Sequence, residues 1–288
     1  MNSKTYKTRE QFTSLYLSQS YQDAWENYSL SLKREDFAVW DYVVLTASNA
    51  QQADIFNAQI ILRKAYLPSR TKFVVIPDEE GKRVGSGGAT LSVLKYLRSV
   101  ENSFDGLRIL VIHSGGDSKR IPQYSALGKL FSPVPRRLPD GRPSTLFDEI
   151  FIVMSALAGR LREGMLVISG DVLPLFNPLL VDYSGEGAAA ISFKEKVEIA
   201  TNHGVFLSED DKSNLLKAFF HKMSVGALHA SGAVNARGYV DIDTGAIILG
   251  KDILASLYSL ISVDGIFSES LYKKFVNDHV RLSLYGDL

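Results

Sequence analysis

The sequence predicts an α/β fold with a doubly wound, mixed but mostly parallel sheet. From Asp41 onward, short apolar runs rich in valine and isoleucine alternate with longer amphipathic runs. This alternation is typical of buried parallel strands joined by crossover helices. The 288 residues are 45% hydrophobic, which is enough for a substantial core in one main domain.

The predicted elements follow one another regularly. Residues 1–40 are polar and helical in pattern, and we interpret them as an arm that packs outside the sheet or contributes to a homo-oligomer contact. Residues 41–288 then form the main domain. In its first part, strands are expected at 42–47, 72–77, 108–113 and 165–169, and helices at 53–66, 90–100 and 144–161.

The pattern of apolar runs in the sequence changes after Gly185. Shorter strand-like runs replace the regular alternation, and a helix is expected at about 251–261. We therefore expect more antiparallel pairing in this half. The runs are AAAISF, HGVFLS, LLKAFF and YVDIDTGAIIL.

Composition limits the classes of function. Lys plus Arg equals Asp plus Glu at 32 each, so no overall field attracts nucleic acid or a membrane surface. The absence of cysteine excludes disulfides, thiolate metal sites and cysteine nucleophiles. The start MNSKTYKTREQF lacks the apolar core of a signal peptide, and no apolar run reaches the roughly 18 residues that span a bilayer. We expect a cytoplasmic protein.

The strongest motif follows the predicted strand RILVIH. Ligands of open α/β sheets bind beyond the carboxyl ends of strands, where this segment must lie. Adjacent glycines let backbone N–H groups approach an oxyanion, and an arginine offers a fork of donors suited to phosphate oxygens. The sequence therefore predicts an anion site formed by Ser114, Gly115, Gly116, Asp117, Ser118, Lys119 and Arg120.

A second cation, Lys129, follows nine positions after Arg120. Gly128 precedes it, and the apolar Leu130 and Phe131 could anchor it. The segment is not a P-loop, which requires Ser or Thr after Gly-Lys, and no G-x-G-x-x-G occurs in the chain. A strand-to-helix turn with surface cations is the alternative interpretation.

A second glycine-rich loop, VGSGGAT at 84–90, follows the strand FVVIP. Gly85, Gly87 and Gly88 open a helix whose N-terminus would favour an anion. A purely structural turn explains these glycines equally well.

Two acidic residues stand where a metal could be held. Asp171 follows the buried-looking strand MLVIS, and carboxylates at such an edge suit Mg²⁺, which shares oxygen ligands with substrate phosphates. A helix N-cap is the alternative role for Asp171. Asp241 and Asp243 are two apart, hence on one face of an extended strand, where a cation or hydrogen bonds must offset their burial. We choose Asp243 as the second metal ligand, the alternative being a bulge or turn that exposes both acids.

Two further segments could bind a hydroxyl-bearing ligand such as a sugar phosphate. Asn202, His203 and Gly204 lie in ATNHGVF, and Lys222 follows an aromatic strand in FFHKM. Amide and imidazole groups pair with hydroxyls, and a lysine can neutralise a phosphate. Each segment alone also fits a structural role.

Together these segments resemble the nucleotidyltransferase region of the L-fucokinase and fucose-1-phosphate guanylyltransferase family, between about Trp40 and Gly250. Gly128 replaces the proline of the general sugar nucleotidyltransferase signature, a departure shared with the fucose-type branch. The matching segments, in order, are WDYVVLTASNAQQADIFNAQ, GKRVGSGGAT, HSGGDSKRIPQYSALGK, SGDV, ATNHGVF and DIDTGAIIL.

The resemblance implies a Rossmann-like, GT-A-like nucleotidyltransferase domain at 41–288 that takes GTP, or another nucleoside triphosphate, and a sugar-1-phosphate. It places the two glycine loops on the nucleotide, Arg120, Lys129 and Asp171 in catalysis, and Lys222 on the sugar phosphate. It also implies Mg²⁺ on Asp171 and Asp243. The chain is too short for the β-helical and kinase regions of many family members, so kinase activity is not expected.

The reaction implied is attack of a sugar-1-phosphate on a nucleoside triphosphate, most specifically GTP and fucose-1-phosphate giving GDP-fucose and pyrophosphate. Two alternatives stay open. One is a transferase for another sugar or base, such as UTP, because base and sugar choice rest on the resemblance alone. The other is a regulatory domain that binds nucleotide or sugar phosphate without turnover.

Overall fold

The computed structural model describes residues 3–79, 84–114, 124, 128–210, 215–276 and 282–284. The chain divides into two compact units. Unit 1 comprises Met1–Ala188 and Leu249–Leu288, and unit 2 is Ala189–Ile248. Among the described residues, no helix combines the length and apolar character needed to cross a membrane.

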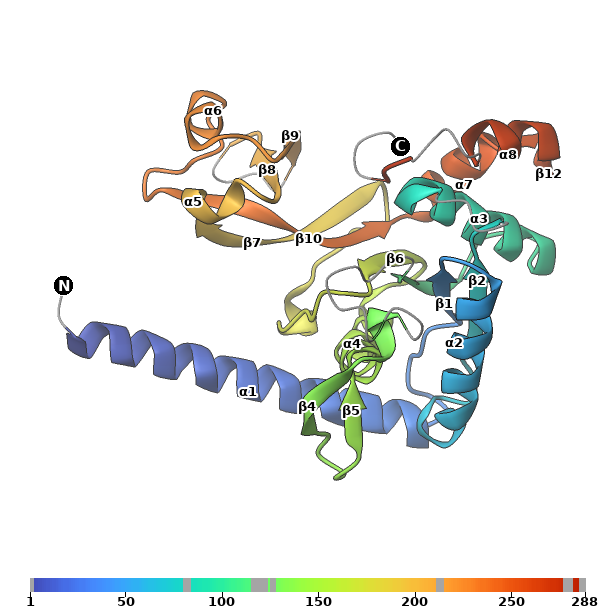
Figure 1. Ribbon diagram of the computed structural model, residues 1–288, viewed down its shortest axis with the longest axis horizontal. Helices are drawn as coiled ribbons and strands as arrows, with labels where there is room; N and C mark the ends of the chain where they lie inside the picture. Colours follow the sequence, from blue (N-terminus) through green and yellow to red (C-terminus); the bar gives the residue numbers. More distant parts are fainter. Residues whose placement is uncertain are drawn as a thin grey trace. The chain divides into compact units, whose positions relative to one another are not determined.

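The centre of unit 1 is a parallel sheet (Figure 1). Its strands are β1 (Tyr42–Ala47), β2 (Lys72–Pro77), β3 (Arg108–His113) and β6 (Gly164–Ser169), arranged in the order β2-β1-β3-β6. All three pairings are parallel, and β1 is buried throughout. The four predicted strands are confirmed to within one residue.

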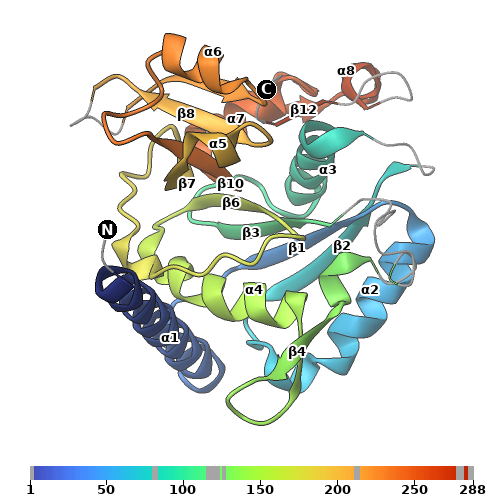
Figure 2. The ribbon, with the colours of Figure 1, turned by 60° about the vertical axis from the view of Figure 1, so that its left-hand side comes forward.

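Helices cover both faces of this sheet, as Figure 2 shows for α3 (Gly85–Val100) and α4 (Leu146–Ser155). Phe73 in β2 packs against Phe151 in α4, with ring centroids 5.5 Å apart. Phe73 pairs with Val43 of β1, so both side chains lie on the α4 face of the sheet. Thr46 is three residues further along β1, and its side chain therefore lies on the opposite face. There it contacts His113, which in turn contacts Thr90 of α3. The expected doubly wound α/β class is therefore confirmed.

One crossover of the sheet has the opposite hand to the others. Helix α2 (Ala50–Leu62) lies on the same face as α4, since Arg63, just after α2, binds Asp148 of α4. The path β1-α2-β2 and the path β3-α4-β6 run in opposite directions across the sheet on that one face. These two crossovers therefore have opposite hands. The crossover β2-α3-β3 has the same hand as β1-α2-β2, because it runs in the other direction across the sheet and passes over the other face. Such mixed handedness is rare in parallel sheets.

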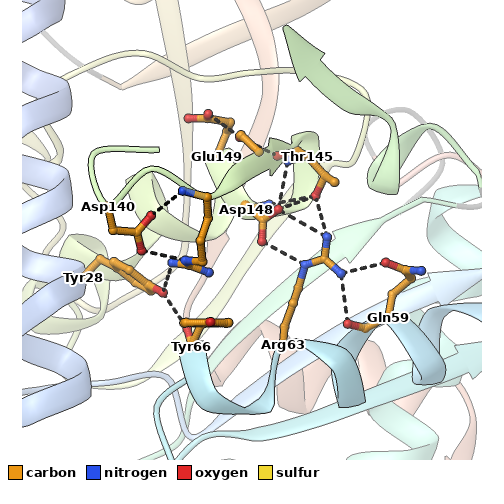
Figure 3. A network of polar contacts seen from close by, with 10 residues as sticks. Tyr28, Gln59, Arg63, Tyr66, Asp140, Thr145, Asp148 and Glu149 are labelled. Carbon is orange, nitrogen blue, oxygen red and sulfur yellow. Dashed lines mark hydrogen bonds and ion pairs between the residues drawn. The ribbon is translucent and has the colours of Figure 1, made fainter. Parts of the chain in front are cut away.

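Polar contacts fix α4 at this junction (Figure 3). Thr145 caps the helix in a capping box with Asp148, and the Arg63 guanidinium bonds to both Asp148 carboxylate oxygens at 2.9 and 3.3 Å. Arg63 also donates to Thr145 Oγ1 and to the Gln59 side chain. Because Arg63 and Asp148 are only 14% and 12% exposed, this pair ties two helices together within low-dielectric surroundings.

The N-terminal residues form one long helix, α1 (Ser3–Lys33). Near its C-terminal end Tyr28 is buried, contacts Phe151 with ring centroids 6.1 Å apart, and donates its hydroxyl to the Tyr66 carbonyl at 2.6 Å. Further towards the N-terminus, Phe12 and Leu15 are exposed. The predicted helical arm thus packs against α4 through its C-terminal part.

The remaining elements of unit 1 are short. The expected helix at 144–161 begins two residues later than predicted, at the Thr145 cap, and continues beyond Ser155 as a 3₁₀-helix. The short elements are η1 (Lys64–Tyr66), η4 (Lys129–Phe131), β4 (Pro133–Arg137), β5 (Pro143–Thr145), η5 (Ala156–Arg160), η6 (Pro178–Leu180), α7 (Lys251–Ser259), β11 (Ser262–Val263), β12 (Ile266–Phe267) and α8 (Glu269–Phe275).

Unit 2 carries the antiparallel pairing that the sequence predicts. Strand β8 pairs antiparallel with both neighbouring strands, β9 and β10, and β7 pairs with β10. A small core of apolar side chains, including Val205, Leu228 and Ile242, stabilises the unit. Its elements are β7 (Ala188–Lys196), α5 (Val197–Ala200), β8 (Gly204–Ser208), β9 (Leu216–His221), α6 (Val225–Ala230) and β10 (Tyr239–Leu249).

Candidate functional site

The carboxyl edge of the unit 1 sheet brings several predicted residues together. His113 pairs with Thr46 on one side and Ser169 on the other, so the segments after β1, β3 and β6 leave the sheet at one level. Gly170 lies against the start of the next loop, because a Cβ there would approach Ser114 Cβ to 3.0 Å. This is the edge at which open α/β sheets bind ligands.

Lys129 and Asp171 form an ion pair at this edge. The Lys129 Nζ to Asp171 Oδ2 distance is 2.9 Å, and Ser169 Oγ donates to Asp171 Oδ1 at 2.6 Å. Burial opposes ionisation of Asp171, but the Ser169 hydrogen bond and the Lys129 charge outweigh it and lower the pKa of this carboxyl. The edge therefore presents an ionised carboxylate beside a cation.

The backbone conformation at position 128 explains why a glycine precedes Lys129. The φ of Gly128 is 65°, in the left-handed region that favours glycine. A Cβ here would lie 3.0 Å from the Phe56 ring and 3.1 Å from Gln52 Nε2, so the chain passes directly over α2. Leu130 and Phe131 are buried, as the sequence predicts, and they anchor Lys129 from below.

Much of the predicted anion loop lies outside the described residues. This applies to Gly115, Gly116, Asp117, Ser118, Lys119 and Arg120, whose roles stay predictions. Ser114 is described. Its Oγ donates to the Thr46 carbonyl at 2.5 Å and its N–H donates to Thr46 Oγ1 at 3.3 Å.

The glycines of the predicted second loop lie in the first turns of α3, because this helix begins at Gly85, five residues before the predicted start. Gly85 has φ 75° and a Cβ there would lie 2.2 Å from the Leu282 carbonyl oxygen. The Gly87 N–H donates to that same oxygen at 2.9 Å, and a Cβ at Gly88 would meet Val84 at 2.7 Å. The close contacts explain Gly85 and Gly88 structurally, and the proposed role of all three glycines in nucleotide binding stays a prediction.

In unit 2, Gly204 lies against Asp243, and its neighbour His203 contacts Lys222 through the backbone. A Cβ at Gly204 would lie 3.1 Å from Asp243 Cβ and 2.6 Å from the Phe219 ring, so only glycine permits this close approach. The Lys222 N–H donates to the His203 carbonyl at 3.0 Å, and Lys222 adopts a left-handed φ of 53°. Asn202 is exposed in the turn before β8.

The environment of Asp243 penalises its charge. Burial raises the pKa of Asp243, although a hydrogen bond from the Gly245 N–H and the charges of His221 and His203 act against this rise. His221 lies opposite Gly204 in the β8–β9 pairing and was not predicted as a site residue. Its signal in the sequence is its position between the aromatic strand and Lys222.

Asp241 differs from Asp243 although both point to one face of β10, as predicted. Lys194 Nζ binds both Asp241 carboxylate oxygens at 2.9 and 2.8 Å. Val240 and Ile242 on the other face are buried. A protein cation thus compensates Asp241, which leaves Asp243 as the better candidate for an external cation.

The two predicted metal ligands belong to different units, Asp171 to unit 1 and Asp243 to unit 2. Both offer carboxylate oxygens, the donor type that Mg²⁺ prefers, so their chemistry fits this ion. Within the described part of the chain, no group of three or more His, Asp or Glu side chains is arranged to hold a metal. Metal binding therefore stays a prediction.

The fold and the site define an α/β protein with a lysine–carboxylate ion pair at the carboxyl edge of a parallel sheet, the edge at which open α/β sheets bind ligands. A family model for the fucose pyrophosphorylase domain matches residues 101–288. The chain belongs to this family.

Relatives of known name agree with this assignment. The chain is 29% identical to a bifunctional fucokinase/GDP-fucose pyrophosphorylase of Arabidopsis thaliana, over 92% of this chain and 28% of the relative. It is 31% and 30% identical to the fucose-1-phosphate guanylyltransferases of Mus musculus and Homo sapiens, over 68% of this chain and 35% and 34% of theirs. The chain thus matches about a third of the length of these relatives.

Proposed function

We propose that the chain is a nucleotidyltransferase that converts GTP and fucose-1-phosphate into GDP-fucose and pyrophosphate. The family match, which spans both Lys129 and Asp171, carries this proposal. The names of the relatives supply the base and the sugar. The ion pair at the sheet edge supplies the charged groups that a reaction between two phosphates needs.

The reaction joins two anions. A phosphate oxygen of the sugar-1-phosphate attacks the α-phosphorus of the triphosphate, the bond to the bridging oxygen breaks, and pyrophosphate leaves with the electron pair. A phosphomonoester has its second pKa near 6, so the attacking oxygen is already largely ionised at neutral pH. The protein needs no general base, and positioning with charge neutralisation supplies the catalysis.

Each predicted residue has a role in this reaction. Lys129 and Arg120 neutralise the triphosphate and the charge that develops on the leaving pyrophosphate. Lys129 can exchange Asp171 for a phosphate oxygen, because both partners of the pair are partly exposed. Bound Mg²⁺ would polarise the α-phosphate, with Asp171 and Asp243 as its protein ligands.

Unit 2 contributes the proposed sugar-phosphate residues. Asn202 and His203 offer polar groups to sugar hydroxyls, and Lys222 offers a cation to the phosphate. All three are exposed, hence accessible to a ligand. Gly204, which directly follows Asn202 and His203, lets the backbone approach Asp243 closely, and this contact supports the proposal that the sugar phosphate binds near Asp243.

A substrate matrix tests the proposal. GTP, UTP, ATP and CTP are each combined with fucose-1-phosphate and other hexose-1-phosphates, with and without Mg²⁺, and pyrophosphate release is measured. We expect the highest kcat/KM with GTP and fucose-1-phosphate, and no release when either substrate or Mg²⁺ is omitted. Preference for another pair would disprove the substrates but keep the reaction class. Nucleotide binding without pyrophosphate release would favour the regulatory domain.

A further inference from the structure

His113 occupies a central position that the proposed reaction does not use. It is the last residue of β3 and directly precedes Ser114, the first residue of the predicted anion loop. Its ring contacts two elements: Nδ1 lies 3.3 Å from Thr46 Oγ1 of β1, and Nε2 lies 3.1 Å from Thr90 Oγ1 of α3. The imidazole therefore bridges the sheet edge and the first turns of the helix that begins at the second glycine loop.

The neighbouring hydrogen bonds fix the direction of every proton in this bridge. The single Thr90 hydroxyl proton is donated to the Ser86 carbonyl at 2.8 Å, so Thr90 Oγ1 must accept from the imidazole. His113 Nε2 consequently carries the proton. In the neutral ring Nδ1 is then an acceptor, which receives the Thr46 hydroxyl proton, and Thr46 Oγ1 in turn accepts the Ser114 N–H at 3.3 Å.

The result is one continuous chain of donors from the start of the anion loop to α3. It runs from the Ser114 N–H through Thr46, His113 and Thr90 to the Ser86 carbonyl. Ser114 is held a second time, because its Oγ donates to the Thr46 carbonyl. Hydrogen bonds in such a chain polarise one another in the same sense, so the loss of an interior member weakens contacts that it does not make itself.

We propose that His113 is a positioning residue, which couples Ser114, at the end of β3, to the first turns of α3 through Thr46 and Thr90. It touches no reacting atom. Its role is to hold Ser114 in place at the carboxyl edge of the sheet, where a displacement of about 1 Å can cost about a hundredfold in rate. The kinetic part of this inference rests on the proposed function, and the geometric part does not.

Burial is consistent with a ring that stays neutral. Both partners of the ring nitrogens are uncharged hydroxyls, and burial lowers the pKa of His113 to about 4. At neutral pH the ring therefore keeps the single-proton form on which the direction of the chain depends. A protonated ring would present a second donor to Thr46 and reverse that hydroxyl.

The decisive variant is Thr90→Val, because among the described residues the hydrogen bonds of the Thr90 hydroxyl reach Ser114 only by way of His113. We expect hydrogen exchange of the Ser114 amide, followed by NMR, to be about 10-fold faster in Thr90→Val than in the wild type. His113→Asn keeps an acceptor towards Thr46 but cannot reach Thr90, so it should show the same acceleration. Adding Thr90→Val to His113→Asn should then change nothing further.

A matched control is Tyr42→Phe. It removes the Tyr42 hydroxyl from its contacts with Glu101 and Lys72 in the same strand as Thr46 but at the opposite edge of the sheet. This variant should lose some stability without changing Ser114 exchange. In pyrophosphate release, Thr90→Val and His113→Asn should raise the KM for GTP or lower kcat by about 10- to 100-fold, whereas Tyr42→Phe should change neither.

The outcomes separate the two proposals. A wild-type protein that releases no pyrophosphate would overturn the proposed function, and Ser114 exchange would still decide whether the coupling exists. Exchange in Thr90→Val that equals the wild-type or Tyr42→Phe rate would overturn the coupling. Faster exchange combined with wild-type kcat and KM would overturn the positioning role, because the bridge would then serve stability alone.

Discussion

At the scale of single residues, the two acids of β10 show how much of a charge's role depends on its neighbours. Asp241 and Asp243 share a strand and a face, yet Lys194 binds Asp241 at 2.8 Å, whereas burial raises the pKa of Asp243. A carboxylate whose charge the fold penalises is a candidate for a functional role.

We predict that Asp243→Asn lowers kcat/KM by about two to three orders of magnitude, a loss comparable with that of one charge-stabilising group in other active sites. Asp241→Asn should change it less than threefold, because the Asp241 ion pair is exposed on the surface. Steady-state pyrophosphate release compares the two variants directly. Equal losses would contradict the assignment of Asp243.

The Lys129–Asp171 ion pair at the sheet edge leads to a second prediction about single residues. Lys129→Ala and Asp171→Asn should fold normally, because both side chains are partly exposed, and each should reduce turnover by about 100- to 1000-fold. Circular dichroism checks folding, and pyrophosphate release checks activity. Full activity in either variant would disprove its role.

At the scale of elements, the junction of α2 and α4 depends on few residues. Asp148 is both the acidic partner in the Thr145 capping box and the partner of Arg63, with both charges mostly buried. Removing one partner of a buried pair leaves the other charge uncompensated.

Asp148→Asn should therefore lower the free energy of unfolding by about 2–4 kcal/mol, and Thr145→Ala by about 1 kcal/mol. Urea denaturation measures both. The control is Asp36→Asn, which breaks the exposed Arg34–Asp36 pair and should leave the midpoint unchanged. A loss in Asp148→Asn as small as that in the control would show that the junction does not depend on this pair.

The elements also show what sequence can and cannot predict. The strands of unit 1 follow from runs such as YVVLTA and RILVIH, because burial on both faces demands continuous apolar side chains. Helix bounds depend instead on local caps. Asn49 caps α2, which begins at Ala50, three residues before the predicted position. Thr145 caps α4, which begins at Leu146, two residues after the predicted position. The hairpin of β4 and β5 was missed because PVPRR is short, polar and interrupted by proline.

Part of the candidate site escaped prediction for a related reason. Thr46 and Thr90 are ordinary polar residues in sequence, and only pairing of β1 with β3 and docking of α3 bring them to His113. The contact of Gly85 with the Leu282 backbone joins segments almost 200 residues apart. No local pattern encodes such partners, whereas the position of Asp171 at the sheet edge was predictable because it closely follows the buried strand β6.

At the scale of the whole molecule, stability should depend on pH through His113. The pKa of His113 is about 4 in the folded protein against 6.5 for an ordinary histidine. Between these values the unfolded chain binds a proton that the folded chain does not, so stability is complete above about pH 6.5 and falls as pH decreases towards 4. The full shift corresponds to about 3 kcal/mol as an upper bound.

His113→Asn should be less stable than the wild type at pH 7.5, but should lose less stability on acidification. Thermal unfolding midpoints between pH 7.5 and 4 measure the difference in slope. Parallel curves for the two proteins would show that His113 titrates in the folded state as it does in the unfolded chain.

The mixed handedness of the unit 1 crossovers means that its layers of strands and helices do not require the present order of chain connections. The same strands and helices, traced as β3, α4, β1, α2, β2, α3 and β6, would give three crossovers of one hand without moving any of these elements. Helix α4 would then lead back to β1, and α3 would pass over the sheet to β6. Unit 1 thus has the layers of a domain whose crossovers all share one hand, but the chain connects them in a different order. In this order β3, the strand that precedes the predicted anion loop, comes third along the chain instead of first.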